Sequence, residues 1–417
     1  MPTKPRARES RRPLAFAVAM LALLTQGPLP AQTTEARDTV WLTNGKELKG
    51  RVVRVDSKEV VLRTGSRDRT FPRDEVERIV SVASQHRELI AAWQDTASND
   101  ADALLALAMR AEHADLPHEA RLLRWYAVLQ RPTDAKIHEA LGNRPRGGGF
   151  LVEIDRKWVP FDKADALGED FDDAWRLRSE HFALQCAAGL RAGLDTLMEL
   201  ETLYWLFMDV FGQDLALLEI VEAMPVRLYR SRAQMPNLSN NVGAYFAADE
   251  QTLYTCFENG RPFALMHEAT HALLFHFFVR AAKSRGSLPA WLDEGWAEYI
   301  DGRVQTRVPG KPKLLSGSVQ AGHFAALATA KKQDDLYTVH RVLNFKTTDF
   351  QASSKQDVKY AQAWALFRYL FEHKDPALRA LFLDYLREAR DGQGQASTFR
   401  RLFARQEKQI ETEPWQG

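Results

Sequence analysis

The residues whose types and spacing are best suited to chemistry form the stretch H-E-A-T-H at residues 267–271. Apolar residues around it recur at helical intervals, and neither Gly nor Pro interrupts residues 263–282. We therefore expect one long, largely buried helix with Pro262 in its first turn. Because residues four apart lie on the same face of a helix, His267 and His271 are expected to point at one metal ion.

Glu268 gives this stretch the form H-E-x-x-H, in which two histidines bind zinc and the glutamate acts as general base on a zinc-bound water. The alternative is a buried helix whose histidines are merely hydrogen-bonded, and the bare motif does not exclude it. A catalytic zinc site needs a third protein ligand and leaves its fourth position for water. The next segment of the chain supplies a candidate for that ligand.

That segment is W-L-D-E-G-W-A-E-Y, residues 291–299. Glu294 begins a second helical pattern after a short loop, so its carboxylate is expected to fold back onto the metal as the third ligand. Glu298, one turn further on the same face, is expected to accept a hydrogen bond from the free ring nitrogen of a ligand histidine. Helical periodicity turns Asp293 away from this face and leaves Asp301 for solvent or the helix end.

The combination of H-E-A-T-H with W-L-D-E-G-W-A-E-Y resembles the gluzincin metallopeptidases, whose third zinc ligand is the glutamate of an E-G-x-A type motif. The resemblance is close over residues 261–302, and the chain lacks the G-x-M-E-N signature of the large aminopeptidases. The metzincins are excluded, because their Gly and His positions are occupied here by Leu274 and Phe277. By the same resemblance, Tyr360 is expected to stabilise the oxyanion, with a buried structural tyrosine as the alternative.

These residues predict a zinc-dependent hydrolase, and the resemblance implies a metallopeptidase that acts on peptide or protein substrates. Zn2+ held by His267, His271 and Glu294 would lower the pKa of its water, and Glu268 would pass the proton to the leaving amine. Two alternatives stay open: a catalytically silent peptidase fold that serves as a binding or scaffold protein, and a zinc amidase acting on a non-peptide cell-envelope substrate. The intact Glu268 argues against the silent form.

Residues 1–31 have the composition of a targeting segment. Basic residues between Lys4 and Arg12 precede an apolar run at 14–24, and a Gly-Pro break leads to Ala31. This order predicts a signal peptide cleaved near Ala31, and hence an exported protein, periplasmic or secreted, without stable membrane insertion. Removing five basic and one acidic residue leaves 51 basic and 54 acidic residues, a net charge of −3. Near-neutral charge gives no support for nucleic acid as a partner.

The fold expected from the sequence is α+β and multidomain. Residues 38–82 contain short β-branched runs separated by turn residues such as Asn44-Gly45, and they resemble a small SH3-like or Sm-like β-barrel. Residues 84–142 are expected to be helical and resemble a tetratricopeptide-like repeat, which would offer a surface to a protein partner; a plain helical linker is the alternative. Residues 143–163 are expected to form a connecting hairpin.

Residues 164–417 are expected to form the gluzincin-like, thermolysin-like catalytic domain, with a mixed sheet before the motif helix and further helices after it. An edge strand of that sheet would bind extended peptide by main-chain hydrogen bonds, and residues 243–247 are the candidate. Cys186 and Cys256 each lie in a strand-like run, and an oxidising compartment would allow one disulfide between them. His323 is isolated in the sequence and is expected to be structural.

Overall fold

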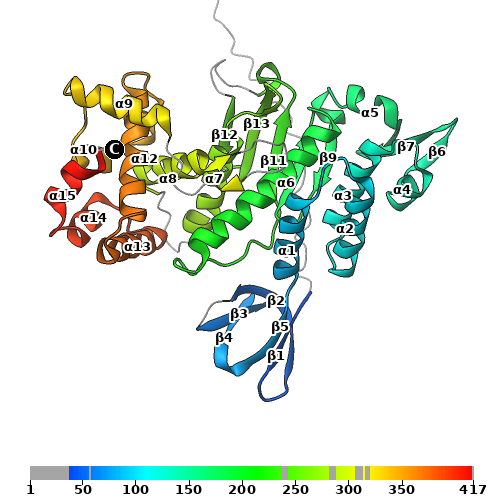
Figure 1. Cartoon of the computed structure of the whole chain (residues 1–417), viewed down its shortest axis with the longest axis horizontal. Coiled ribbons are helices and arrows are strands. Elements are labelled where there is room, and N and C mark those ends of the chain that lie inside the picture. The colour runs from blue at the N-terminus through cyan, green and yellow to red at the C-terminus, as the bar shows by residue number, and fades with distance from the viewer. Residues whose placement is uncertain are drawn as a thin grey trace, which may run out of the picture. The chain divides into compact units, whose positions relative to one another are not determined.

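The computed structural model describes residues 37–417 except 56–57, 237–242, 281–287, 306–312, 315–319 and 416–417. The predicted signal peptide at residues 1–31 lies outside this part of the chain. Residues 34–417 form one compact unit in which helices and several β-sheets are mixed along the chain (Figure 1). The fold is therefore mixed α/β. None of the described helices combines the length and the apolar composition that a membrane span requires.

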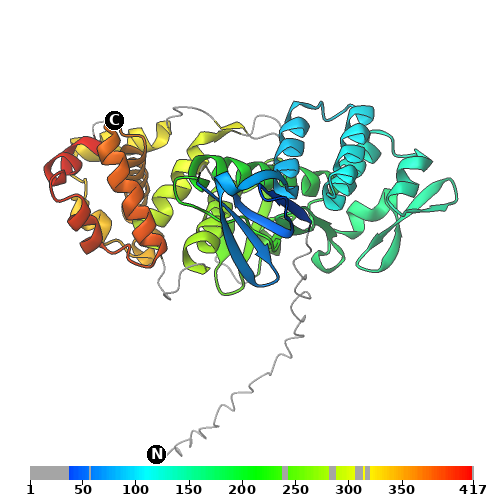
Figure 2. The same ribbon diagram turned by 90° about the horizontal axis from the view of Figure 1, so that it is seen from below.

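The described chain begins with a five-stranded antiparallel sheet in the order β4-β3-β2-β1-β5. Its strands are β1 (Asp38–Leu42), β2 (Glu47–Val55), β3 (Glu59–Thr64), β4 (Arg67–Pro72) and β5 (Val76–Val80). The predicted turn between the first two strands is present: Gly45 has a φ of +80°, and the Asn44 side chain accepts a hydrogen bond from the Lys46 backbone N–H. The strands enclose a small apolar core of their own. Figure 2 shows these strands in blue.

A helical segment follows, as the sequence predicts. Its helices are α1 (Val82–Asp95), α2 (Ala101–His113), α3 (Pro117–Gln130) and α4 (Ala135–Ala140). The side chains of Ser81, Asp100 and Asp134 accept backbone hydrogen bonds at the starts of α1, α2 and α4. Pro117 opens α3, where its missing N–H leaves no helical hydrogen bond unmade.

A small three-stranded sheet and a short helix connect this segment to the next. They are β6 (Arg144–Arg146), β7 (Gly149–Ile154), β8 (Lys157–Pro160) and α5 (Phe161–Leu167). Asp155 and Arg156, both at positive φ, form the turn of the β7–β8 hairpin. The connecting hairpin predicted within residues 143–163 is thus confirmed.

The central sheet has the order β12-β13-β11-β10-β9. Its strands are β9 (Trp175–Arg178), β10 (Phe182–Cys186), β11 (Met224–Tyr229), β12 (Ala244–Ala247) and β13 (Thr252–Glu258). β10, β11 and β13 are parallel, whereas β9 and β12 are antiparallel edge strands. The strand predicted at 243–247 therefore lies at an edge. The long helix α6 (Leu190–Phe207) packs on this sheet.

The cysteines do not form the disulfide that the sequence allowed. Cys186 and Cys256 are buried free thiols. They lie on β10 and β13, which flank β11. Because neighbouring strands are about 4.8 Å apart, backbones two strands apart are separated by roughly 10 Å, which is beyond the reach of a disulfide.

The H-E-x-x-H helix begins later than predicted. Pro262 belongs to the short strand β14 (Arg261–Pro262), which pairs with β13, and α7 spans Leu265–Leu274. Ala264, with a left-handed φ of +46°, turns the chain from β14 into α7. The helix then continues as a π-helical turn over Phe275–Arg280. The pairing of Pro262 with Phe257 replaces the helical first turn that its position suggested.

Helices make up most of the remaining chain (Figure 1). They are α8 (Ala290–Arg303), α9 (Ala321–Lys332), α10 (Val339–Leu343), α11 (Thr347–Gln351), α12 (Gln356–Phe371), α13 (Pro376–Arg390), α14 (Ala396–Leu402) and α15 (Glu407–Thr412). A two-stranded sheet of β15 (Val304–Gln305) and β16 (Lys313–Leu314) follows α8. Both α7 and α12 pack against α8, and α12 also contacts α9. One apolar core extends from α1 through the central sheet to these helices.

Candidate metal centre

Three side chains from α7 and α8 converge on one point. The Nε2 atoms of His267 and His271 are 3.1 Å apart, as expected for histidines one turn apart on a helix face. Glu294, from the first half of α8, places its Oε2 atom 3.4 Å from Nε2 of His267 and 3.5 Å from Nε2 of His271. The structure thus brings together the three residues that the sequence predicted as metal ligands.

The protonation of this triangle follows from the groups behind it. Nδ1 of His271 lies 2.9 Å from Oδ1 of Asp293, and Nδ1 of His267 lies 3.4 Å from Oε1 of Glu298. Each carboxylate therefore favours a proton on Nδ1, which leaves the Nε2 lone pair of each ring directed at the centre. Glu294 Oε2 is buried there and accepts no hydrogen bond from any described residue.

Three lone pairs that face one another repel unless a cation lies between them. The three interatomic separations also match the edges of a zinc tetrahedron, about 3.3 Å for ligand bonds of about 2.0–2.1 Å. Two imidazoles and one carboxylate are a donor set that catalytic zinc sites use. His267, His271 and Glu294 therefore fit a zinc ion by charge, donor type and spacing.

The surroundings keep the third ligand ionised. Burial raises the pKa of Glu294, but the adjacent imidazoles of His267 and His271 outweigh burial and lower that pKa to about 2. A carboxylate ligand binds metal in its ionised form. Glu294 is therefore a carboxylate at any pH at which the protein is expected to work.

Glu268 lies between the three ligands and the edge of the central sheet. Its Oε2 atom accepts a hydrogen bond of 3.2 Å from the backbone N–H of Phe246, in the edge strand β12. Being next to His267 in sequence, Glu268 leaves α7 on the side that faces this strand. Glu268, the predicted general base, would thus lie beside a molecule bound along β12 and close to His267, His271 and Glu294.

Tyr360, on α12, also faces the site. Its ring centroid is 6.4 Å from that of His267. Burial, followed by the negative charges of Glu294, Glu298 and Glu268, raises the pKa of Tyr360 well above its usual range, so the phenol keeps its proton. A cavity of about 780 Å³ opens beside Tyr360 and Glu298, and α9 and the start of α12 form its walls.

Asp293 corrects one expectation. Periodicity alone turned this residue away from the metal-facing side of α8, yet its carboxylate bonds His271. His271 contacts Asp293 near the start of α8, whereas His267, which comes earlier in α7, contacts Glu298 further along α8. The two helices therefore run antiparallel, and the two histidines span about one turn of α8. Glu294 fits between the two rings, and Asp293 can then reach the outer edge of His271. Asp301 is exposed, as predicted.

His323 is a supporting residue that the sequence did not reveal. Its Nε2 atom is 2.7 Å from Oε2 of Glu298, and the amide of Gln320 lies 3.5 Å from the same oxygen. His323 therefore holds the carboxylate that faces His267. No sequence pattern marks His323, because it comes close to Glu298 only through the packing of α9. For Asp293, the sequence signal that could have indicated a role at the site was its position next to Glu294, the predicted third ligand.

A second group of histidines and glutamates has a different character. His86, His181 and Glu201 are fully buried and lie close enough together to suggest a metal site. However, the Trp205 indole N–H, which can only donate, bonds Nδ1 of His86. That bond fixes the proton on Nε2 of His86, which bonds Glu119 at 3.1 Å. His86 therefore has no free lone pair with which to bind a metal, and we interpret this group as a hydrogen-bond network.

Comparison with known sequences adds one finding. A family described as "Protein of unknown function (DUF1570)" matches residues 263–391. The matched segment includes α7, α8, α9 and α12, and so all the residues of the candidate metal centre. A search of curated proteins found no match to this sequence.

Proposed function

We propose that the protein is a zinc-dependent hydrolase, and specifically a metallopeptidase of the gluzincin type. The observation that carries this proposal is the convergence of the Nε2 atoms of His267 and His271 on the buried, hydrogen-bond-free Oε2 of Glu294. The H-E-x-x-H motif on one helix and the downstream glutamate on the next agree with it. In this proposal the residues after 164 form a thermolysin-like catalytic domain with C-terminal helices.

The proposed chemistry divides the work among the surrounding residues. Zinc bound by the three ligands would activate a water and polarise the carbonyl of the scissile bond. Glu268 takes a proton from that water and delivers it to the leaving nitrogen. The neutral phenol of Tyr360 can donate a hydrogen bond to the oxygen that becomes negative in the transition state. Asp293 and Glu298 keep both histidines in the orientation that zinc requires.

The position of Glu268 supports a peptide as substrate. An extended peptide that adds to the edge strand β12 would form main-chain hydrogen bonds with it. Glu268 already contacts the backbone of Phe246 in that strand, so a peptide placed there would pass between β12 and the ligand triangle. This arrangement favours peptide bonds over an unrelated amide, although the same chemistry would also cleave a non-peptide cell-envelope substrate.

The other parts of the chain have proposed roles as well. The N-terminal sheet is an SH3-like or Sm-like module, and α1–α4 are a tetratricopeptide-like segment suited to contact with a protein partner. Export after cleavage near Ala31 would place the enzyme in the periplasm or outside the cell.

Hydrolysis of an unfolded protein substrate by the purified chain tests the proposal, with Glu268→Gln as the matched variant. The wild type should cleave the substrate. Glu268→Gln should bind zinc as well as the wild type but lose at least about a hundredfold in activity, since general-base catalysis commonly contributes 10²–10⁴. A wild type that binds zinc yet leaves protein substrates intact while releasing cell-wall fragments would redirect the proposal to the amidase. Undiminished activity in Glu268→Gln would contradict the mechanism.

A further inference from the structure

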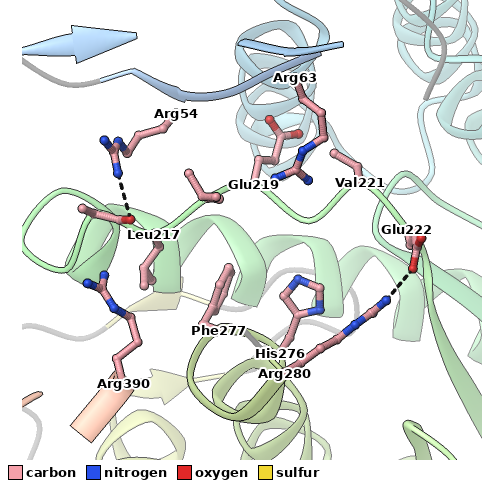
Figure 3. A pocket seen from close by; sticks show the side chains of 12 residues that line it. Arg54, Arg63, Leu217, Glu219, Val221, Glu222, His276, Phe277, Arg280 and Arg390 are labelled. Carbon is pink, nitrogen blue, oxygen red and sulfur yellow. Dashed lines mark hydrogen bonds and ion pairs between the residues drawn. The ribbon is translucent and has the colours of Figure 1, made fainter. Parts of the chain in front are cut away.

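Figure 3 shows a cavity of about 480 Å³ between the N-terminal sheet and the helical continuation of α7. The four arginines that line it are each paired with a carboxylate: Arg54 with Glu59, Arg63 with Asp68, Arg280 with Glu222, and Arg390 with Asp391. These pairs leave the cavity without a surplus of positive charge for an anionic ligand. The edge of the central sheet, by contrast, presents a ring and a backbone strand that a further molecule can contact.

A row of aromatic rings crosses the face of the central sheet that is opposite to α6. Side chains alternate between the two faces of a strand, so that in β13 Leu253 joins the main core and Tyr254 joins a separate cluster. The rings of this cluster follow one another in the order Phe171, Tyr229, Tyr254 and Tyr245. Neighbouring rings are nearly parallel, with interplanar angles of 17°, 9° and 0°. The row therefore runs toward the edge strand β12.

At its β12 end the row advances by one ring per strand. Tyr245 of β12 lies directly opposite Tyr254 of β13, and their ring centroids are 4.7 Å apart. This separation matches the spacing of neighbouring strands, about 4.7–4.9 Å, so the rings stack along the hydrogen-bonding direction of the sheet. A further strand beside β12 would therefore place a side chain against the far face of Tyr245.

Tyr245 is the last ring of the row at this end. Tyr254 is covered on both sides, because Arg227, opposite it in β11, lies with its guanidinium carbon 5.6 Å from the ring centroid. Tyr254 is accordingly only 3% exposed, whereas Tyr245 is partly exposed. Within the part of the chain that the structure describes, Tyr254 is the one ring that lies against Tyr245. The row thus ends on an aromatic face that can take a partner.

The backbone beside Tyr245 is suited to a further strand. β12 lies at the edge of the central sheet, and the N–H of Phe246 points away from β13, because it bonds Glu268 (Figure 1). In an antiparallel pair, the residues next to a hydrogen-bonded position form close pairs, with Cα atoms about 4.5 Å apart. Tyr245 would hold such a position toward an added strand. The side chain opposite it would therefore be in close contact with its ring.

We propose that Tyr245 selects an aromatic side chain in a peptide bound along β12. This inference rests on the proposed function, because it assigns the specificity of the same site. The peptide residue opposite Tyr245 would extend the row by one ring, and cross-strand aromatic pairs are favourable beyond the area that they bury. Tyr245 is next to Phe246, whose N–H meets Glu268. The selected side chain would therefore lie close in the peptide sequence to the cleaved bond.

Digestion of an unfolded protein by the wild type, with the products sequenced by mass spectrometry, is the first part of the test. An aromatic residue should recur at one fixed position, within about two residues of the cleaved bond, because neighbouring residues of a strand are about 3.4 Å apart. Peptides that differ only at this position, with Phe, Leu or Arg, are then compared. The Arg peptide is included because Arg227 lies against a ring of this same row.

The wild type should cleave the Phe peptide with a kcat/KM about 3–10-fold higher than that of the Leu peptide, the increment expected for one aromatic pair. This ratio should fall to near one in Tyr245→Val, which removes the ring and suits a strand. Tyr245→Phe is the matched control, since it keeps the ring, and it should keep the preference. Thermal unfolding and zinc content establish that each variant is folded. The comparison of Phe with Leu on the wild type holds even if Tyr245→Val does not fold.

Three results would overturn the inference and leave the hydrolase in place. They are equal cleavage of the Phe and Leu peptides, a preference for Arg, and a preference for Phe that Tyr245→Val retains. Sedimentation of the wild type covers a different occupant of the edge. A dimer that Tyr245→Val dissociates would assign β12 to a second copy of the chain, and would also overturn the inference.

Binding of the same peptides to Glu268→Gln, measured by fluorescence anisotropy, separates this inference from the proposed function, because binding needs no turnover. The Phe peptide should bind more tightly than the Leu peptide by the same factor of about 3–10. That result without cleavage by the wild type would uphold the role of Tyr245 and contradict the hydrolase. Neither binding nor cleavage of any of the peptides would overturn both.

Discussion

At the scale of single residues, the two histidine ligands are held by different partners. His271 has a short contact with Asp293, whereas His267 faces Glu298 at a longer distance, and His323 holds Glu298 in turn. Each carboxylate fixes the ring nitrogen that carries the proton, and so determines whether the opposite nitrogen can bind zinc. The affinity of the site for zinc should therefore depend on residues that do not touch the ion.

Zinc titration of Asp293→Asn and Glu298→Gln measures this dependence. Both variants should bind zinc about 10–100-fold more weakly than the wild type, the usual loss when an outer partner of a metal ligand is removed. Asp301→Asn is the control, because it makes the same change on the same helix at an exposed position. An unchanged affinity in Asp293→Asn would mean that the contact with His271 has no part in zinc binding.

Tyr360 has a separate role, in catalysis and not in metal binding. Tyr360→Phe removes only the phenolic O–H and keeps the ring that packs near His267. The variant should keep its zinc while kcat falls about 10²–10³-fold, the usual cost of losing an oxyanion donor. Steady-state kinetics on the substrate of the wild type is the measurement. A fall in KM or in zinc content with unchanged kcat would show that the residue acts elsewhere.

At this scale the sequence predicted His267, Glu268, His271 and Glu294. The prediction was possible because residues four apart lie on one helix face, as do His267 and His271 in one helix and Glu294 and Glu298 in the next. It did not predict the role of Asp293. That role depends on how α8 lies against α7. The periodicity of a single helix carries no information about the crossing angle and the relative shift of two packed helices. His323 is a similar case, since it reaches Glu298 only through the packing of α9.

At the scale of elements, the close packing of α8 against α12 positions the third ligand. Gly295 follows Glu294, and a Cβ atom at this position would lie 2.5 Å from the backbone oxygen of Ala363 in α12. Only glycine permits this approach of the two helix backbones. The glycine of the E-G-W-A sequence is therefore explained by helix packing.

Gly295→Ala should consequently force α8 away from α12 and displace Glu294. We expect a loss of roughly 1–3 kcal/mol in the free energy of unfolding, the usual cost of overpacking, together with weaker zinc binding. Gly322→Ala is the control, because a Cβ there meets nothing within 4 Å on helix α9. The control should be neutral or more stable by up to about 1 kcal/mol. Chemical denaturation and zinc titration of both variants give the answer, and equal stability of the two would contradict the packing argument.

The order and type of most elements could be predicted, since apolar periodicity, caps and turn residues act locally. The start of α7 could not. A proline such as Pro262 suits the first turn of a helix, but here its backbone pairs with that of Phe257 in the neighbouring strand β13. The local sequence does not predict this pairing. The same limit applies to the cysteines, because strand order in the sheet places β11 between them.

At the scale of the whole molecule, a buried charged network joins the N-terminal sheet to the rest of the chain. Arg51 of β2 bonds Glu180 and Glu219, and His181 lies between Glu219 and Glu201. Burial lowers the pKa of His181, but the negative charges of Glu201 and Glu219 outweigh burial and raise that pKa to about 10. No sequence pattern predicted this network, because its members are spread over four segments of the chain.

The network predicts a specific dependence of stability on pH. A histidine whose pKa is about 10 when folded and about 6.5 when unfolded stabilises the fold fully below pH 6.5. That contribution is lost as pH rises toward 10, with a slope of up to about 1.4 kcal/mol per pH unit. The free energy of unfolding, measured from pH 6.5 to 10, should fall in the wild type and be flatter in His181→Gln. A wild type whose stability stays constant over this range would show that His181 is uncharged.

The central claim is that His267, His271 and Glu294 bind one zinc ion, and that the buried group around His86 and His181 binds none. Zinc measured by mass spectrometry on the purified protein tests both parts. The wild type and His86→Gln should carry about one zinc per chain, as one catalytic site requires, and the double variant His267→Ala/His271→Ala should carry almost none. Full zinc in the double variant, or loss of zinc in His86→Gln, would place the metal elsewhere and contradict the account.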